Sequence, residues 1–180
     1  LLGIHTVTSS LIRLKSGELS YITKRIDRNA KGEKIHMLDM FQITEAFDKY
    51  RSSMEKVGKA VIEHSSHTLL DVLRLYELVI FTYITGNNDM HLKNFSLILK
   101  DENWGFAPAY DLLNAQLHLS EDKEETALTI GGKKSRLTKS DFIILGVKFG
   151  LSEKQIENVF KRCIKAEKKM LLLIDQSFLS

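Results

Sequence analysis

The stretch TGNNDMHLKNFSLIL at residues 85–99 decides how this chain folds, because it joins a long apolar segment to a strand-like segment through a short polar loop. Within this loop, Asp89 and Asn94 stand five positions apart. A second stretch, APAYDLLN at residues 107–114, adds Asp111 after a strand–turn–strand pattern. Two carboxylates and an amide so placed can hold Mg²⁺ and orient a hydroxyl group on a phosphate, so the sequence predicts the core of a kinase site.

Composition indicates an ordinary globular protein. The chain has 180 residues, 43% hydrophobic and 27% charged, which is enough for one domain or two closely packed lobes. A net charge of +3 gives no argument for binding nucleic acid or a membrane. The longest apolar run, residues 78–84, is far too short to span a bilayer, and the single Cys163 excludes an internal disulfide. These features predict a cytoplasmic protein that does not bind membranes.

The N-terminal segment predicts a β-hairpin. Residues 11–14 and 19–26 read as strands around a turn that contains Gly17. The polar run at residues 27–34 reads as an exposed connector and as the boundary between two lobes.

Helical patterns follow this connector. Residues 38–44 predict a short helix, and Ser52 with Glu55 predicts the capping box of the next one. Thr68 with Asp71 marks the start of a third helix.

The third helix is predicted to be the buried spine of the domain, because apolar residues cover nearly all of its sides up to Thr85. Gly86 is placed to end it in a left-handed conformation. Short strands are expected at residues 95–99 and 105–107, and the acidic segment 115–125 reads as a mobile loop.

The C-terminal part predicts a short strand at residues 127–130 and two helices. Thr138 caps the first helix and Gly150 stops it. Ser152 with Gln155 caps the second. The second helix is expected to carry a long apolar stripe, formed by Ile156, Val159, Phe160, Cys163, Ile164 and Leu171.

Each residue of the polar loop also has a simpler interpretation. Asp89 either accepts the proton of a substrate hydroxyl or orients that hydroxyl, or it caps backbone amides in a tight turn. Asn94 either offers an amide oxygen to Mg²⁺ or satisfies the loop backbone. Lys93 either contacts a phosphate or is a solvated charge, and His91 is better suited to a structural hydrogen bond than to base catalysis. Asp111 either holds Mg²⁺ or caps a helix that begins at the next residue.

Other candidate sites have weaker patterns. His64 and His67 are spaced to share a metal, but no nearby residue completes a tetrahedral set. The segment GGKKS at residues 131–135 lacks the first glycine and the spacing of a Walker motif, so it reads as a basic turn near the site.

These motifs resemble the HipA-like serine/threonine kinases, which are toxins of bacterial toxin–antitoxin modules. The similarity is carried by GNNDMHLKNFS at residues 86–96 and by APAYD, which ends at Asp111. KRIDR at residues 24–28 resembles the hinge of the family, which usually has phenylalanine where Ile26 stands. Three further segments fit, so that the resemblance covers roughly residues 3–170: DMFQ at 39–42, KY at 49–50 and LTIGGK at 128–133.

The resemblance implies an α+β, protein-kinase-like fold that uses ATP and Mg²⁺. A truncated small lobe, the hairpin and hinge at residues 1–28, would precede a mainly helical large lobe at residues 29–180. Asp89 would be the catalytic aspartate, and Asn94 and Asp111 would bind the metal.

Six further residues, two in the catalytic motif and four in the hinge, are also assigned by the resemblance. His91 and Lys93 match the catalytic motif without a specific role. The hinge around Arg25, Ile26, Asp27 and Arg28 would bind adenine through backbone groups, with Asp27 near the ribose.

One part of the family pattern does not occur in these residues. The phosphate-covering loop and the strand lysine of the family should precede the segment at residues 3–4, and neither is found there. Lys15 and Lys24 are misplaced relative to the hinge. The chain therefore reads as the C-terminal portion of a longer kinase, weak or inactive by itself, with truncation favoured over an evolved pseudokinase.

Partners follow from the same resemblance. We expect a protein substrate and a HipB-like DNA-binding antitoxin, with DNA contacted only through the antitoxin. The main alternative is a catalytically inactive kinase lobe that engages an antitoxin or a separate small-lobe chain. A third hypothesis is a metal-dependent nuclease or phosphatase that uses Asp89 and Asp111.

Overall fold

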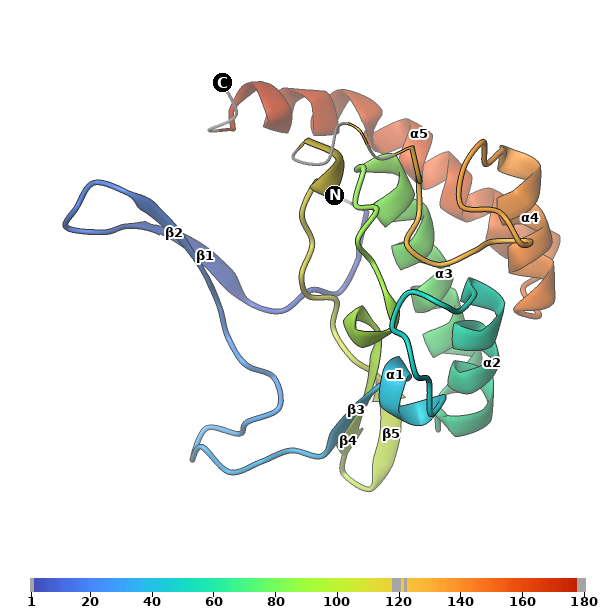
Figure 1. Cartoon of the computed structure of the whole chain (residues 1–180), viewed down its shortest axis with the longest axis horizontal. Coiled ribbons are helices and arrows are strands. Elements are labelled where there is room, and N and C mark those ends of the chain that lie inside the picture. The colour runs from blue at the N-terminus through green and yellow to red at the C-terminus, as the bar shows by residue number, and fades with distance from the viewer. Residues whose placement is uncertain (1, 118–120, 122, 178–180) are drawn as a thin grey trace.

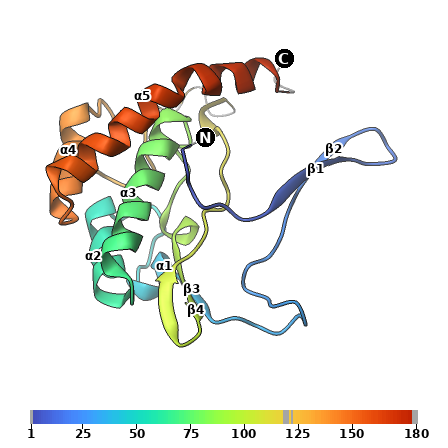
Figure 2. The ribbon, with the colours of Figure 1, turned by 180° about the vertical axis from the view of Figure 1, so that it is seen from behind.

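The computed structural model describes residues 2–117, 121 and 123–177. Helices form one body of the molecule, and a two-stranded ribbon projects from it (Figure 1). Seen from behind, the N-terminal segment passes close to α3 before it enters the ribbon (Figure 2).

The projecting ribbon is the predicted hairpin. Strand β1, Ser9–Arg13, pairs antiparallel with β2, Leu19–Thr23. Gly17 in the connecting turn has φ 92°, a value that glycine adopts without steric cost. Side chains on both faces of the ribbon are exposed, so the two strands are held together by their own hydrogen bonds and not by a core.

The residues before the hairpin belong to the helical body. Val7 donates its backbone N–H to the carbonyl of Ala109 at 2.9 Å, and Ala109 donates to His5 at 2.8 Å. Val7 is buried and Ile4 packs against the core. The start of the chain is therefore fastened to the segment that leads into Asp111.

A three-stranded antiparallel sheet lies beside the helices, in the order β3-β4-β5. Its strands are β3, Met37–Asp39, β4, Ser96–Lys100, and β5, Asn103–Phe106. The prediction of a single helix at residues 38–44 was wrong, because Leu38 belongs to β3 and pairs with Leu97. The helix is only α1, Met40–Ile43, which begins with a capping box between Asp39 and Gln42.

Helix α2 is Met54–His64, and its cap is shifted by one residue from the prediction. The Ser53 side chain, not that of Ser52, accepts the hydrogen bond of the first turn. The backbone carbonyl of Ser52 instead accepts from Thr129 at 3.2 Å. Glu55 accepts from Gly131 N–H at 2.9 Å, so the capping box predicted for Ser52 and Glu55 does not form.

Helix α3, Thr68–Ile84, is the buried spine that the sequence predicted. It ends before Gly86, which has φ 69°. Its core-facing side chains are at most 2% exposed, as for Val72, Leu75, Tyr76, Leu78, Val79 and Ile80.

The start of α3 differs from the prediction. His67 is the N-cap and makes no side-chain cap, so Thr68 and Asp71 do not form the expected start signal. Asp71 is 1% exposed and accepts from Ser65 Oγ at 2.6 Å and from Phe106 N–H at 2.8 Å. This carboxylate therefore joins α3 to β5.

Helices α4, Lys139–Lys148, and α5, Glu153–Asp175, close the fold. Both predicted caps are confirmed, with Thr138–Asp141 and Ser152–Gln155 capping boxes. Only the first part of the predicted apolar stripe on α5 is covered, because Ile164 is 69% exposed.

The strand predicted at residues 127–130 was wrong, whereas the loop predicted at residues 115–125 is only partly covered by the described residues. Residues 127–130 form no named strand in the described part of the chain, only isolated bridges such as Ser53 with Thr129. In the segment 115–125, Ala115–Leu117 is a 3₁₀ turn, η2, while residues 118–120 and 122 lie outside the described residues. Among the described residues, no helix has the length and apolar character needed to cross a bilayer.

We expect Asp71→Ala to lower the free energy of unfolding by about 3 kcal/mol, because it removes a buried charged acceptor and leaves the N–H of Phe106 unpaired. Urea denaturation measures this change. Glu63→Ala, which removes an exposed carboxylate from α2, is the control and should change the value by less than about 0.5 kcal/mol. Equal effects of the two substitutions would contradict the role given to Asp71.

Candidate active site

The candidate site is the polar loop between α3 and β4. It contains a single 3₁₀ turn, η1, at Leu92–Asn94. Asn87, His91 and Asn94 are buried, whereas Asp89 is half-buried. The loop is therefore packed into the body, and the side chains of Asp89 and Lys93 reach toward the surface.

The Asp89 carboxylate receives a hydrogen bond from a side chain far away in sequence. Tyr50 Oη donates to Asp89 Oδ1 at 2.9 Å. The capping role considered for Asp89 falls instead to Asn87, whose Oδ1 accepts from the Asp89 N–H at 3.4 Å. No backbone amide of a described residue donates to the Asp89 carboxylate, so the second oxygen can accept a hydrogen bond from a bound group.

Asn94 is tied to Asp89 through the nitrogen of its amide. Asn94 Nδ2 donates to the Asp89 carbonyl at 3.1 Å. This contact fixes the loop, as the simpler interpretation of Asn94 requires, and it leaves the amide oxygen as the atom for a cation. The two interpretations of Asn94 are thus compatible.

Asp111 has an unusual backbone conformation. Its φ is 57°, a left-handed value that is uncommon in residues other than glycine. Asn87 Nδ2 donates to the Asp111 carbonyl at 3.1 Å and so holds this conformation. The helix cap considered for Asp111 is wrong, because no helix begins at Leu112.

Tyr110 fastens the Asp111 segment to the polar loop. Its hydroxyl donates to the Lys93 carbonyl at 2.8 Å and is paired with Ser96 Oγ at 2.6 Å. Burial raises the pKa of Tyr110 to about 12, so the hydroxyl keeps its proton. Through these bonds Asp111 and Asn94 belong to two segments that are directly joined.

His91 and Lys93 have different surroundings. Burial and then the Lys49 ammonium group lower the pKa of His91, against the opposing effects of Asp89 and Asp111. Lys49 Nζ lies 2.9 Å from His91 Nε2. Lys93 is exposed, and its ammonium group lies over the Phe41 ring, 5.0 Å from the centroid.

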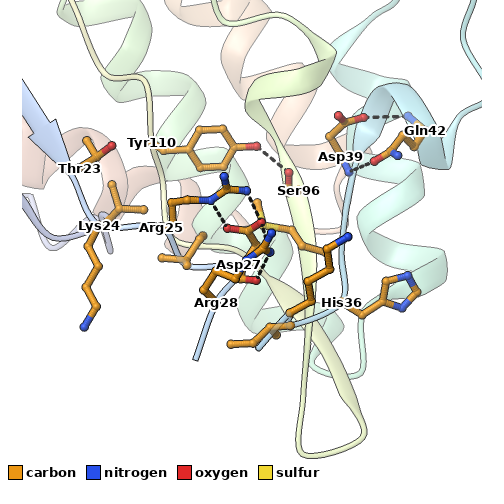
Figure 3. Close-up of a pocket in the computed structure, with 15 residues that line it drawn as sticks. Thr23, Lys24, Arg25, Asp27, Arg28, His36, Asp39, Gln42, Ser96 and Tyr110 are labelled. Carbon is orange, nitrogen blue, oxygen red and sulfur yellow. Dashed lines mark hydrogen bonds and ion pairs between the residues drawn. The ribbon is translucent and has the colours of Figure 1, made fainter. Parts of the chain in front are cut away.

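A pocket of about 720 Å³ opens beside the predicted hinge, a size typical of sites for small ligands. Its lining includes the predicted hinge residues Arg25, Ile26, Asp27 and Arg28, and also Ser96 and Tyr110, which adjoin the polar loop and the Asp111 segment. Figure 3 shows the hinge side chains and Tyr110 around the same space. The pocket therefore contains the predicted hinge and reaches residues close in sequence to Asn94 and Asp111, but Asp89, Asn94 and Asp111 do not themselves line it.

Backbone groups of the hinge are available to a ligand. The N–H and C=O groups of Arg25 and Ile26 make no hydrogen bond to another described residue. The Asp27 carboxylate, in contrast, accepts from Arg25 and Arg28 at 2.6 Å and 2.8 Å. The hydrogen bonds from Arg25 lower the pKa of Asp27 to about 2. Asp27 can contact a ribose only if the ribose hydroxyl replaces one of the two arginines as its partner.

The remaining candidates lie outside this arrangement. In the GGKK turn, the Gly131 N–H already donates to Glu55, and Lys133 and Lys134 are paired with Asp141 and Glu124. Within the described residues, no three His, Cys, Asp or Glu side chains form a metal cluster, so His64 and His67 do not belong to one. Mg²⁺ needs few protein ligands when phosphate oxygens supply the rest, so Asn94 and Asp111 fit it as hard oxygen donors.

Sequence reasoning assigned no role to three side chains of the site. Lys49 and Tyr50 reach the polar loop from the segment before α2, and Tyr110 joins this loop to the Asp111 segment. The only signal was their position inside motifs that match the family.

Comparison with known proteins supports the family assignment. Residues 1–170 match the HipA-like C-terminal domain. A Haemophilus influenzae protein named "Putative kinase" is 24% identical over 90% of this chain and 55% of its own length. "Putative kinase Y4dM" of Sinorhizobium fredii is 33% identical over 82% of this chain and 38% of its own length. The chain thus spans about half, or less, of these relatives.

Solved structures show the fold. Shewanella oneidensis HipA, solved with HipB and operator DNA, matches with a TM-score of 0.75 and 16% identity over 92% of this chain and 44% of that one. The Helicobacter pylori proinflammatory kinase CtkA matches with a TM-score of 0.55 and 13% identity, covering 89% of this chain and 67% of that one. The predicted kinase-like α+β fold is confirmed. The chain belongs to the family of the HipA-like C-terminal domain, whose relatives reported above are named putative kinases.

Proposed function

We propose that this chain carries the catalytic lobe of an ATP-dependent, HipA-like serine/threonine protein kinase. The observation that supports this most directly is the arrangement of Asp89, Asn94 and Asp111 on two segments joined by Tyr110. These segments border a ligand-sized pocket whose other wall is the hinge. The boundary between a small lobe at residues 1–28 and a large lobe at residues 29–180 is part of the proposal.

Each group has a role in this proposal. The free backbone groups of Arg25 and Ile26 bind the adenine edge. Asn94 and Asp111 would hold Mg²⁺, which neutralises charge on the phosphates during transfer. Asp89 accepts the hydrogen bond of a serine or threonine hydroxyl and orients it toward the γ-phosphate.

His91 and Lys93 support this reaction in different ways. His91, which is buried and whose Nε2 atom lies 2.9 Å from Lys49 Nζ, keeps the loop in shape. Lys93, held over Phe41 on the exposed side, is suited to contact the substrate.

The 180 residues by themselves are expected to transfer phosphate weakly. Ahead of the hinge they contain no glycine-rich loop with a strand lysine, the groups that stabilise the γ-phosphate in kinases. Activity is therefore best measured on the natural polypeptide that contains these residues.

A binding role is the second candidate, and the hairpin favours it. Both of its faces carry exposed apolar side chains, including Leu11, Ile12, Leu19 and Ile22. By analogy with the HipA structure solved with HipB and DNA, the partner in a toxin–antitoxin module would be a HipB-like antitoxin, with DNA bound through it. A separate small-lobe chain is the other partner that an inactive lobe would engage.

We expect Asp89→Asn to reduce phosphoryl transfer from Mg-ATP at least a hundredfold, because the amide cannot accept the hydroxyl proton. Transfer of labelled γ-phosphate to protein measures this, and Asp101→Asn in the β4–β5 turn is the control. Full activity of Asp89→Asn would rule out the kinase assignment. Phosphoester hydrolysis without ATP would favour the nuclease or phosphatase hypothesis instead.

We expect Asp111→Asn to raise the Mg²⁺ concentration needed for half-maximal ATP binding about tenfold or more, since a neutral amide is a weaker ligand than a carboxylate. Calorimetric titration of Mg-ATP into this chain and its variant measures the effect. Glu102→Gln, which neutralises an exposed carboxylate, should bind like the unchanged chain. An identical Mg²⁺ requirement for Asp111→Asn would remove Asp111 from the metal site.

A further inference from the structure

We propose that Lys49 and Tyr50 are positioning residues that hold the catalytic loop in its working geometry. This inference rests on the proposed kinase function and adds two residues to it. Both lie in the connection between α1 and α2, about forty positions before the loop that they contact.

A local turn presents the two side chains. Asp48 Oδ1 accepts from the Tyr50 N–H at 2.8 Å, and the Asp48 carbonyl accepts from the Arg51 N–H at 3.3 Å. The Lys49 carbonyl accepts from the Leu92 N–H at 3.2 Å. The turn is thus attached to the catalytic loop through its backbone as well as its side chains.

Tyr50 controls the rotation of the catalytic carboxylate. It donates to Asp89 Oδ1 at 2.9 Å, and no other side chain of a described residue donates to the Asp89 carboxylate. With Oδ1 occupied, Oδ2 is left to accept the substrate hydroxyl. The Tyr50 ring also meets His91 edge-on, with centroids 5.1 Å apart, so its own orientation is fixed.

Lys49 selects the tautomer of His91. An ammonium group has donors only, so the His91 Nε2 atom at 2.9 Å must accept, and the ring proton must sit on Nδ1. Lys49 Nζ also lies 4.8 Å from the centroid of the Tyr50 ring, which links the two side chains.

The arrangement is unfavourable for stability, which argues for a functional role. His91 Nδ1 is buried without a hydrogen-bond partner among the described residues. A buried donor left unpaired costs free energy, and such groups concentrate where function requires them. Residues that served only the fold would have been expected to satisfy this atom.

The first test uses this chain and needs no enzymatic activity. Long-range ¹H–¹⁵N NMR at alkaline pH reports the tautomer of His91, which a His91→Gln spectrum assigns. We expect the proton on Nδ1 in the unchanged chain and on Nε2 in Lys49→Met, whereas Lys49→Arg keeps the original tautomer. An unchanged tautomer in Lys49→Met would overturn the proposal for Lys49.

The second test uses the natural polypeptide that contains this chain. We expect Tyr50→Phe to lower kcat about tenfold, as the loss of one hydrogen bond in the transition state would, with the KM for ATP changed less than about twofold. Tyr83→Phe, which removes a hydroxyl bound to the Leu137 carbonyl, and Lys56→Met, which removes an exposed lysine of α2, are the controls and should keep kcat.

The two tests separate this inference from the function on which it rests. An unchanged kcat in Tyr50→Phe, or a loss that lies in KM, would overturn the role of Tyr50 even in an active kinase. A polypeptide without ATP-dependent phosphoryl transfer would refute the proposed function. The NMR result would still decide whether Lys49 determines the tautomer of His91.

Discussion

The burial of α3 is the constraint on which the candidate site depends. Core-facing side chains along this helix are covered, so it cannot rotate or slide without opening the core. Gly86 ends the helix in a left-handed conformation, and the polar loop starts from that fixed point. Asp71 adds a second constraint, since its buried carboxylate joins the first turn of the helix to β5. The polar loop that carries Asn94 and the strand that leads toward Asp111 therefore have little freedom.

Amides and hydroxyls build the loop, and the carboxylates are left for chemistry. Asn87 holds the backbones of Asp89 and Asp111, while Asn94 holds the carbonyl of Asp89. Tyr110 joins both sides of the site through one hydroxyl group. Neutral groups can make these internal bonds without adding charge to a site that already contains the carboxylates of Asp89 and Asp111.

Local patterns predicted much of this fold, and long-range contacts account for what they missed. The spine helix, its glycine stop and the two C-terminal capping boxes depend on neighbouring residues, so the sequence revealed them. Leu38 was assigned to a helix because its pairing with Leu97 lies far along the chain. For the same reason Tyr50 and Tyr110 could not be placed, since nothing local shows which backbone or carboxylate a tyrosine hydroxyl will reach.

The exposed ribbon has a consequence for association with other molecules. Two strands with apolar side chains on both faces present unpaired edges, which are templates for adding further strands from other molecules. Arg13, Lys15 and Glu18 near its turn place charges at the tip, where they oppose end-on stacking. The backbone donors and acceptors along these edges are therefore available to pair with a strand of another molecule.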